Sequence, residues 1–121
     1  MSPYTFFAAT LRFVARQPTG GDAQTAAMMA LLEKAATALE AGGAFTIAAA
    51  DLALAGRAFA ATAALLQKQI LPEAVAHGHT AAETQIRWSV DAAMAAVTLL
   101  LSEAAAGAAR SVMVTLPPPP V

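Results

Sequence analysis

The fold is decided by residues 44–70, which read AFTIAAADLALAGRAFAATAALLQKQI. Larger apolar side chains recur in this stretch at intervals of seven residues, at Phe45, Leu52, Phe59 and Leu66, and small residues lie between them. Apolar residues spaced alternately three and four positions apart, which together make a seven-residue repeat, are typical of an α-helix packed in a bundle. We therefore expect one long helix over this range.

Glycine and proline divide the rest of the chain into three more expected helices. Two of these helices begin at good capping sequences, Asp22 for one and the capping box that starts at Thr80 for the other. We expect the additional helices from about Pro3 to Arg16, from Asp22 to Gly42, and from Thr80 to about Ala109. Leu71-Pro72 is expected to interrupt the third helical pattern and His77-Gly78-His79 to end it. The predicted fold is an all-α, up-and-down four-helix bundle over residues 1–111, followed by an extended proline-rich tail over residues 112–121.

Composition narrows the class of protein. The chain has 121 residues, which is one domain, and alanine accounts for 35 of them. The net charge is −1 and the basic residues are scattered, so we expect no nucleic-acid partner. Cysteine is absent, which excludes disulfides and thiolate metal sites. No signal peptide is evident and charged residues interrupt the long apolar stretches, so we predict a cytoplasmic protein with no transmembrane segment.

The third and fourth expected helices have almost no polar face, and only 12% of all residues are charged. A helix that is apolar all round is buried on most sides, so we expect homo-oligomers. A stripe of small residues on the third helix would allow close approach of another helix, either inside the chain or from a second subunit. The interface candidates are Ala49, Ala53, Gly56 and Ala60 on this helix and Leu99 on the fourth.

Two kinds of ligand site have weaker support in the sequence. A pocket for an apolar small molecule, such as a lipid or a cofactor, is predicted between Phe45, Phe59, Trp88 and Met94, because small alanine side chains leave space between helices. His77 and His79 are weak candidates for a metal site, since two imidazoles share one metal at this spacing. A histidine before a helix-ending glycine is also favoured by the helix dipole alone.

No pattern typical of catalysis is found in the chain, and no cofactor is expected. We predict a non-enzymatic, homo-oligomeric accessory or scaffold protein that binds a protein partner. The alternatives are the apolar-ligand protein and an enzyme of unrecognised type that uses His77 or His79.

Both ends of the chain offer further contacts. Pro117–Pro120 is either a disordered tail or a ligand for an aromatic groove. The first helix combines aromatic residues with Arg12 and Arg16, which suits either packing or contact with a membrane or granule surface. In composition alone, the alanine-rich helices are similar to those of granule-coating phasins.

Overall fold

The structure, a computed structural model, describes residues 3–17, 22–107 and 109–118, and this part of the chain is mostly helical. The α-helices are α1 (Pro3–Ala15), α2 (Ala23–Gly42), α3 (Leu52–Leu65), α4 (Leu71–Ala76) and α5 (Thr80–Ala105). The two strands are β1 (Ala44–Ile47) and β2 (Val112–Thr115), and a short 3₁₀ turn (Ala49–Asp51) leads into α3. The expected four packed helical segments are confirmed, with α3 and α4 forming one of them.

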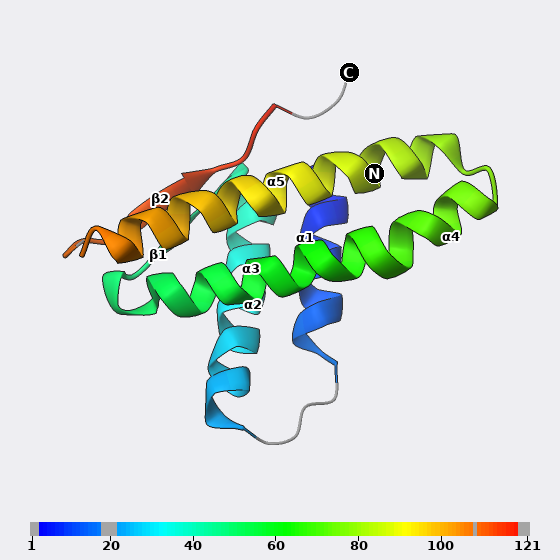
Figure 1. Cartoon of the computed structure of the whole chain (residues 1–121). Helices are drawn as coiled ribbons and strands as arrows, with labels where there is room; N and C mark the ends of the chain where they lie inside the picture. Colours follow the sequence, from blue (N-terminus) through cyan, green and yellow to red (C-terminus); the bar gives the residue numbers. More distant parts are fainter. Residues whose placement is uncertain (1–2, 18–21, 108, 119–121) are drawn as a thin grey trace.

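The helices pack as two helical hairpins that cross one another (Figure 1). In one hairpin α1 lies beside α2. In the other, the continuous stretch that contains α3 and α4 lies beside α5, and α2 contacts α3 where the hairpins cross. The crossing leaves one side of α1 next to the stretch between α3 and α4.

Proline did not interrupt the third helix where the sequence suggested. The chain continues through a π-helical turn, Leu66–Ile70, directly into α4, and we call the whole segment the α3–α4 helix. Leu71 donates its backbone N–H to the carbonyl of Leu66, five residues back. Pro72 lies in the first turn of α4 and has no N–H to donate. The wider turn before Pro72 therefore accommodates the proline without breaking the helix.

The expected start of the third helix at Ala44 was wrong, because residues 44–47 form a strand. Gly43 ends α2 in the left-handed conformation, at φ 73°, and turns the chain away from the helix. Phe45 and Ile47 are buried and Thr46 between them is exposed, which is the two-residue period of a strand.

The segment that the sequence separated as a tail begins with a strand packed on the helices. Val112–Thr115 pairs antiparallel with β1, with Val114 opposite Phe45. Val114 and Leu116 are 2% and 6% exposed, so their side chains belong to the core. Pro119 and Pro120 lie outside the described residues.

The core is organised around a row of aromatic rings at the crossing of the hairpins. Phe7 of α1 lies 6.4 Å from Phe59 of α3 between ring centroids, and both side chains are fully buried. Phe45 of β1 stacks on Phe59 at 5.1 Å, and Trp88 of α5 meets Phe7 edge-on at 6.1 Å. The row joins α1, α3, α5 and β1.

Between α3 and α5 a glycine allows close approach. A Cβ atom placed on Gly56 would lie 2.5 Å from Cδ2 and 2.9 Å from Cγ of Leu101, so a side chain there displaces Leu101. The small-residue stripe therefore makes a contact inside the chain at Gly56.

We predict that Gly56→Leu lowers the free energy of unfolding by about 1–3 kcal/mol through overpacking against α5, although leucine is the better helix former by roughly 1 kcal/mol. Urea unfolding measures the change. Adding Leu101→Ala to the same chain makes room for the new side chain and should restore part of the loss. A Gly56→Leu protein at least as stable as the wild type would contradict the contact.

Candidate interaction surface

A groove runs between α1 and the α3–α4 helix. It has a volume of about 360 Å³. Apolar side chains and one threonine line it, and we call these residues the apolar groove: Phe6, Ala9, Thr10, Phe13 and Ile70. The Thr10 hydroxyl donates a hydrogen bond to the carbonyl of Phe6, so its one donor is already used within the helix. The surface of the groove is therefore almost entirely apolar, with few polar groups left to bind water.

Local structure places both walls of the apolar groove. Phe6, Thr10 and Phe13 lie three or four residues apart and so share one side of α1. Ile70 is the last residue of the π-helical turn. π-helical turns are rare in proteins, and those that do occur often lie at functional sites.

Phe13 projects from the edge of the groove. Its side chain is 54% exposed, although α1 also buries Phe7 and Leu11 completely. A second hollow lies on its other side, lined by Ala9, Arg12, Phe13, Arg16 and Gln17. Phe13 is thus a half-exposed aromatic side chain with a hollow on each side.

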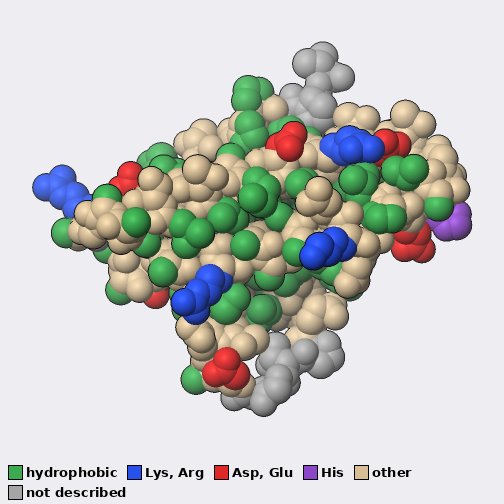
Figure 2. Space-filling view, in the orientation of Figure 1, with side chains coloured by type: hydrophobic (Ala, Val, Ile, Leu, Met, Phe, Trp, Pro, Cys, Tyr) green, Lys and Arg blue, Asp and Glu red, His purple; other side chains and the backbone are tan. Residues whose placement is uncertain are grey.

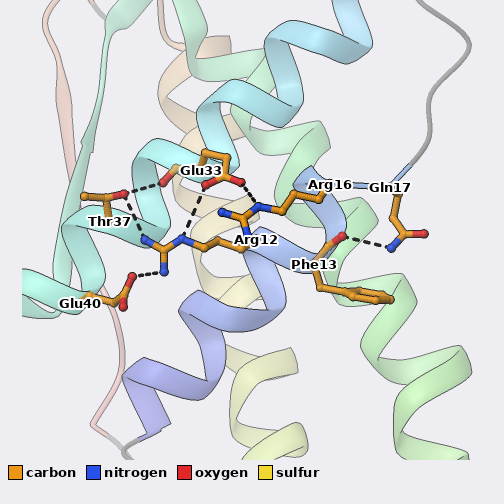
Figure 3. Close-up of polar contacts among 7 residues, drawn as sticks. All are labelled: Arg12, Phe13, Arg16, Gln17, Glu33, Thr37 and Glu40. Carbon is orange, nitrogen blue, oxygen red and sulfur yellow. Dashed lines mark hydrogen bonds and ion pairs between the residues drawn. The ribbon is translucent and has the colours of Figure 1, made fainter.

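The arginines beside this surface are engaged by α2 (Figure 3). Arg12 forms ion pairs with Glu33 and Glu40 and donates a hydrogen bond to Thr37 at 3.2 Å. Arg16 donates to Glu33 at 2.8 Å. Figure 3 shows Phe13 pointing away from Thr37 and Glu40, toward the α3–α4 helix. The network fixes α1 against α2 and balances the positive charge next to Phe13.

The outer face of the second hairpin is also poor in charge. Figure 2 shows hydrophobic side chains spread over this face, with isolated charged groups among them. Met94 and Leu101, two turns apart on α5, are 47% and 41% exposed. Alanine supplies many of the exposed side chains of this face, such as Ala53 and Ala61. Its apolar side chains are therefore smaller than those that line the apolar groove.

The four residues predicted to line an apolar-ligand pocket do not come together around a cavity. Phe45, Phe59 and Trp88 are buried at 3%, 0% and 7% exposure and fill the core through the aromatic row. Met94 lies half exposed on α5.

The small interface candidates occupy different environments. Gly56 is buried against Leu101, and Ala60 and Leu99 are partly buried against the core. Ala49 is partly buried in the 3₁₀ turn, and Ala53 is exposed. Ala53 is therefore the one candidate of this set that reaches the surface freely.

The two histidines lie at the turn between α4 and α5. Both are exposed, and their ring centroids are 5.8 Å apart. A hollow joins them to Glu73, Phe6 and Ile70, but the described residues contain no group of three or more metal-ligating side chains. Metal binding and catalysis by His77 or His79 stay predictions.

The sequence places Phe6 and Phe13 on one face of the first helix but does not indicate the apolar groove. The missing wall is Ile70, which lies far from α1 in the chain and reaches it only through the crossing of the hairpins. The signal available in the sequence was the separation of two apolar faces on the first helix. Phe7, Leu11 and Val14 form one face and Phe6 and Phe13 the other.

Comparisons with family models, curated proteins and solved structures find no significant match for this chain.

By length and composition alone, the helical stretches Ala49–Ala76 and Thr80–Ala105 are apolar enough to cross a membrane. Helices at the centre of a soluble protein meet the same criterion, so the finding is weak evidence for a membrane span. The expected absence of a transmembrane segment, the cytoplasmic location and the absence of a nucleic-acid partner stay predictions.

We predict that Arg12→Ala lowers the free energy of unfolding by about 1 kcal/mol, because one partly buried guanidinium holds two carboxylates of α2 and its stem packs between the helices. Arg87→Ala is the matched control. Its single exposed pair with Glu83 lies within one helix turn and is worth about 0.3–0.5 kcal/mol. Chemical denaturation of both variants compares them, and equal losses would show that the α1–α2 network adds nothing.

Proposed function

We propose that the protein is a non-enzymatic helical scaffold whose copies associate with one another and which binds a protein partner. The observation that carries the proposal is the position of Phe13, a half-exposed aromatic side chain at the edge of an apolar groove on the same helix. One surface thus holds both a protruding group and a hollow that suits it.

This pairing favours a twofold arrangement of two copies. In a twofold dimer the same patch of each subunit meets its counterpart, so a group on one copy contacts a different position on the other. Phe13 of each copy would enter the apolar groove of its partner, beside Phe6 and Ile70. The second copy is therefore the occupant that we propose for the groove.

Charge supports the same arrangement. Two copies related by a twofold axis bring Arg12 and Arg16 of each subunit toward those of the other. Like charges at an interface cost free energy, but Glu33 and Glu40 already neutralise these arginines. The low charge of the whole chain also suits a protein whose surface is partly covered by another copy.

The alternatives have less support. The aromatic residues proposed for an apolar ligand pack against one another in the core. The histidines proposed for catalysis lie exposed at the α4–α5 turn.

We predict that Phe13→Glu reduces the sedimenting species to a single chain of about 12 kDa, since it places two carboxylates near the dimer axis and removes both aromatic contacts. Sedimentation velocity at micromolar concentration makes the measurement. The helical circular dichroism should be unchanged, because Phe13 is half exposed.

Val75→Glu is the matched control. Val75 lies on α4, is 50% exposed and does not line the apolar groove. It should sediment as the wild type does. If both substitutions, or neither, changed the mass, the groove would not be the contact between copies.

A further inference from the structure

Pro118, the last residue that the structure describes, contacts Trp88, the one tryptophan in the sequence. The indole N–H of Trp88 donates a hydrogen bond to the backbone carbonyl of Pro118, at 2.9 Å between Nε1 and O. Trp88 is 7% exposed, whereas Pro118 is exposed. The tryptophan is thus almost covered, and a short surface segment supplies the acceptor for its one polar group.

Aromatic neighbours hold this tryptophan in place. Tyr4 meets the indole edge-on at 5.6 Å between ring centroids, and Phe7 does so at 6.1 Å from within the core. Two edge-on contacts fix the plane of the indole and so the direction of its N–H. A fixed tryptophan beside a tyrosine is the kind of surface that binds polyproline segments in other recognition modules.

The described residues at this surface, Pro117 and Pro118, have the matching chemistry. In the sequence they begin a run of four prolines, residues 117–120. Proline has no N–H, so its neighbours' carbonyls have fewer partners within the segment, and its fixed φ angle keeps the segment extended at a low cost in entropy. Such a segment offers an acceptor to the indole without first having to become ordered.

The chain is firmly held by the core up to Leu116 and only weakly held after it. Leu116 is 6% exposed and follows directly on β2, so the chain up to this residue is held by the core and by pairing with β1. Pro117 is partly buried and Pro118 exposed, and one hydrogen bond joins Pro118 to Trp88. Displacing these two prolines leaves β2 and Leu116 in place.

We propose that Trp88, with Tyr4 beside it, is a recognition site for a proline-rich segment of a partner protein, and that the chain's own Pro117 and Pro118 occupy this site in the free protein. The inference rests on the proposed function in that it gives the chemistry of the protein partner. Of the described residues, a partner's segment needs to displace only Pro117 and Pro118. The tail of a second copy is already held at its own Trp88 by the same hydrogen bond, so an exchange between copies gains no contact, and we assign the site to a different protein.

The test uses the full chain and a fluorescein-labelled peptide of sequence LPPPPV, which is the chain's own residues 116–121. In a tail-glycine variant, with Pro117, Pro118, Pro119 and Pro120 all changed to Gly, the competing segment loses its fixed conformation. Fluorescence anisotropy should show at least tenfold tighter peptide binding to this variant than to the wild type. Adding Trp88→Phe keeps an aromatic ring but removes the donor, and should weaken binding at least tenfold. The peptide LAAAAV is the control and should not bind.

A second measurement does not depend on any variant. The chain has one tryptophan and therefore one indole N–H signal in its proton–nitrogen correlation spectrum. In the wild-type protein this signal should shift progressively with millimolar LPPPPV and stay in place with LAAAAV. A tail-glycine variant that binds no peptide, a Trp88→Phe protein that binds equally well, or an indole signal indifferent to LPPPPV would each overturn the proposal. So would an indole signal of the Phe13→Glu protein that shifts with protein concentration alone, because the occupant would then be a second copy.

These results are independent of the self-association test. The peptide should bind to the Phe13→Glu protein as it does to the wild type, since Phe13 and Trp88 belong to different surfaces. Loss of self-association with peptide binding retained would leave the Trp88 site standing.

Discussion

The contact between the rings of Phe7 and Phe59 is the interaction on which the rest of the structure depends. It lies where α1 of one helical hairpin meets α3 of the other, and both side chains are fully buried. Alanine supplies nine of the 23 buried side chains of this core cluster, and alanines bring helices close together but fill little volume. The few large rings therefore occupy the one region where four elements converge. Truncation of a buried phenylalanine typically costs about 3–5 kcal/mol, a large share of the stability of a domain of this size.

The use of small residues inside the hairpins has a consequence at the surface. Gly56 lets α5 lie so close to α3 that Leu101 covers the glycine while remaining 41% exposed itself. On α1, Phe7 and Leu11 serve the core, which leaves Phe6 and Phe13 for the side that faces the α3–α4 helix. The apolar groove is thus a product of the crossing (Figure 1), because α1 of one hairpin supplies four of its lining residues and the other hairpin supplies Ile70. The ion pairs of Arg12 and Arg16 with Glu33 hold α1 against α2 next to the apolar groove.

Much of the helical architecture could be predicted from local signals. Asp22 caps α2 and the left-handed Gly43 follows its end at Gly42, and the turn at Gly78 separates α4 from α5, because capping and left-handed residues act on their immediate neighbours. The capping box expected from Thr80 does not form, since His79 is the N-cap of α5 and makes no side-chain capping hydrogen bond. The strand β1 was missed because Phe45 fits a seven-residue helical seam as well as a two-residue strand pattern. Pairing with β2, almost 70 residues later, decides between the two. Pro72 does not interrupt the helix as expected, because a π-helical turn precedes it and no local sequence signal indicates such a turn. The apolar groove and the contact of Pro118 with Trp88 depend on tertiary proximity, so only their separate components, an aromatic helix face and a proline run, were visible in the sequence.

We propose that copies of the chain meet at the apolar groove of α1. The most direct test is an isotope-filtered nuclear Overhauser experiment on an equimolar mixture of ¹³C-labelled and unlabelled protein, which records only contacts between different copies. The account predicts intermolecular signals between the ring protons of Phe13 and the methyl protons of Ile70. The absence of an intermolecular signal between these groups, with intermolecular contacts elsewhere or none, would contradict it.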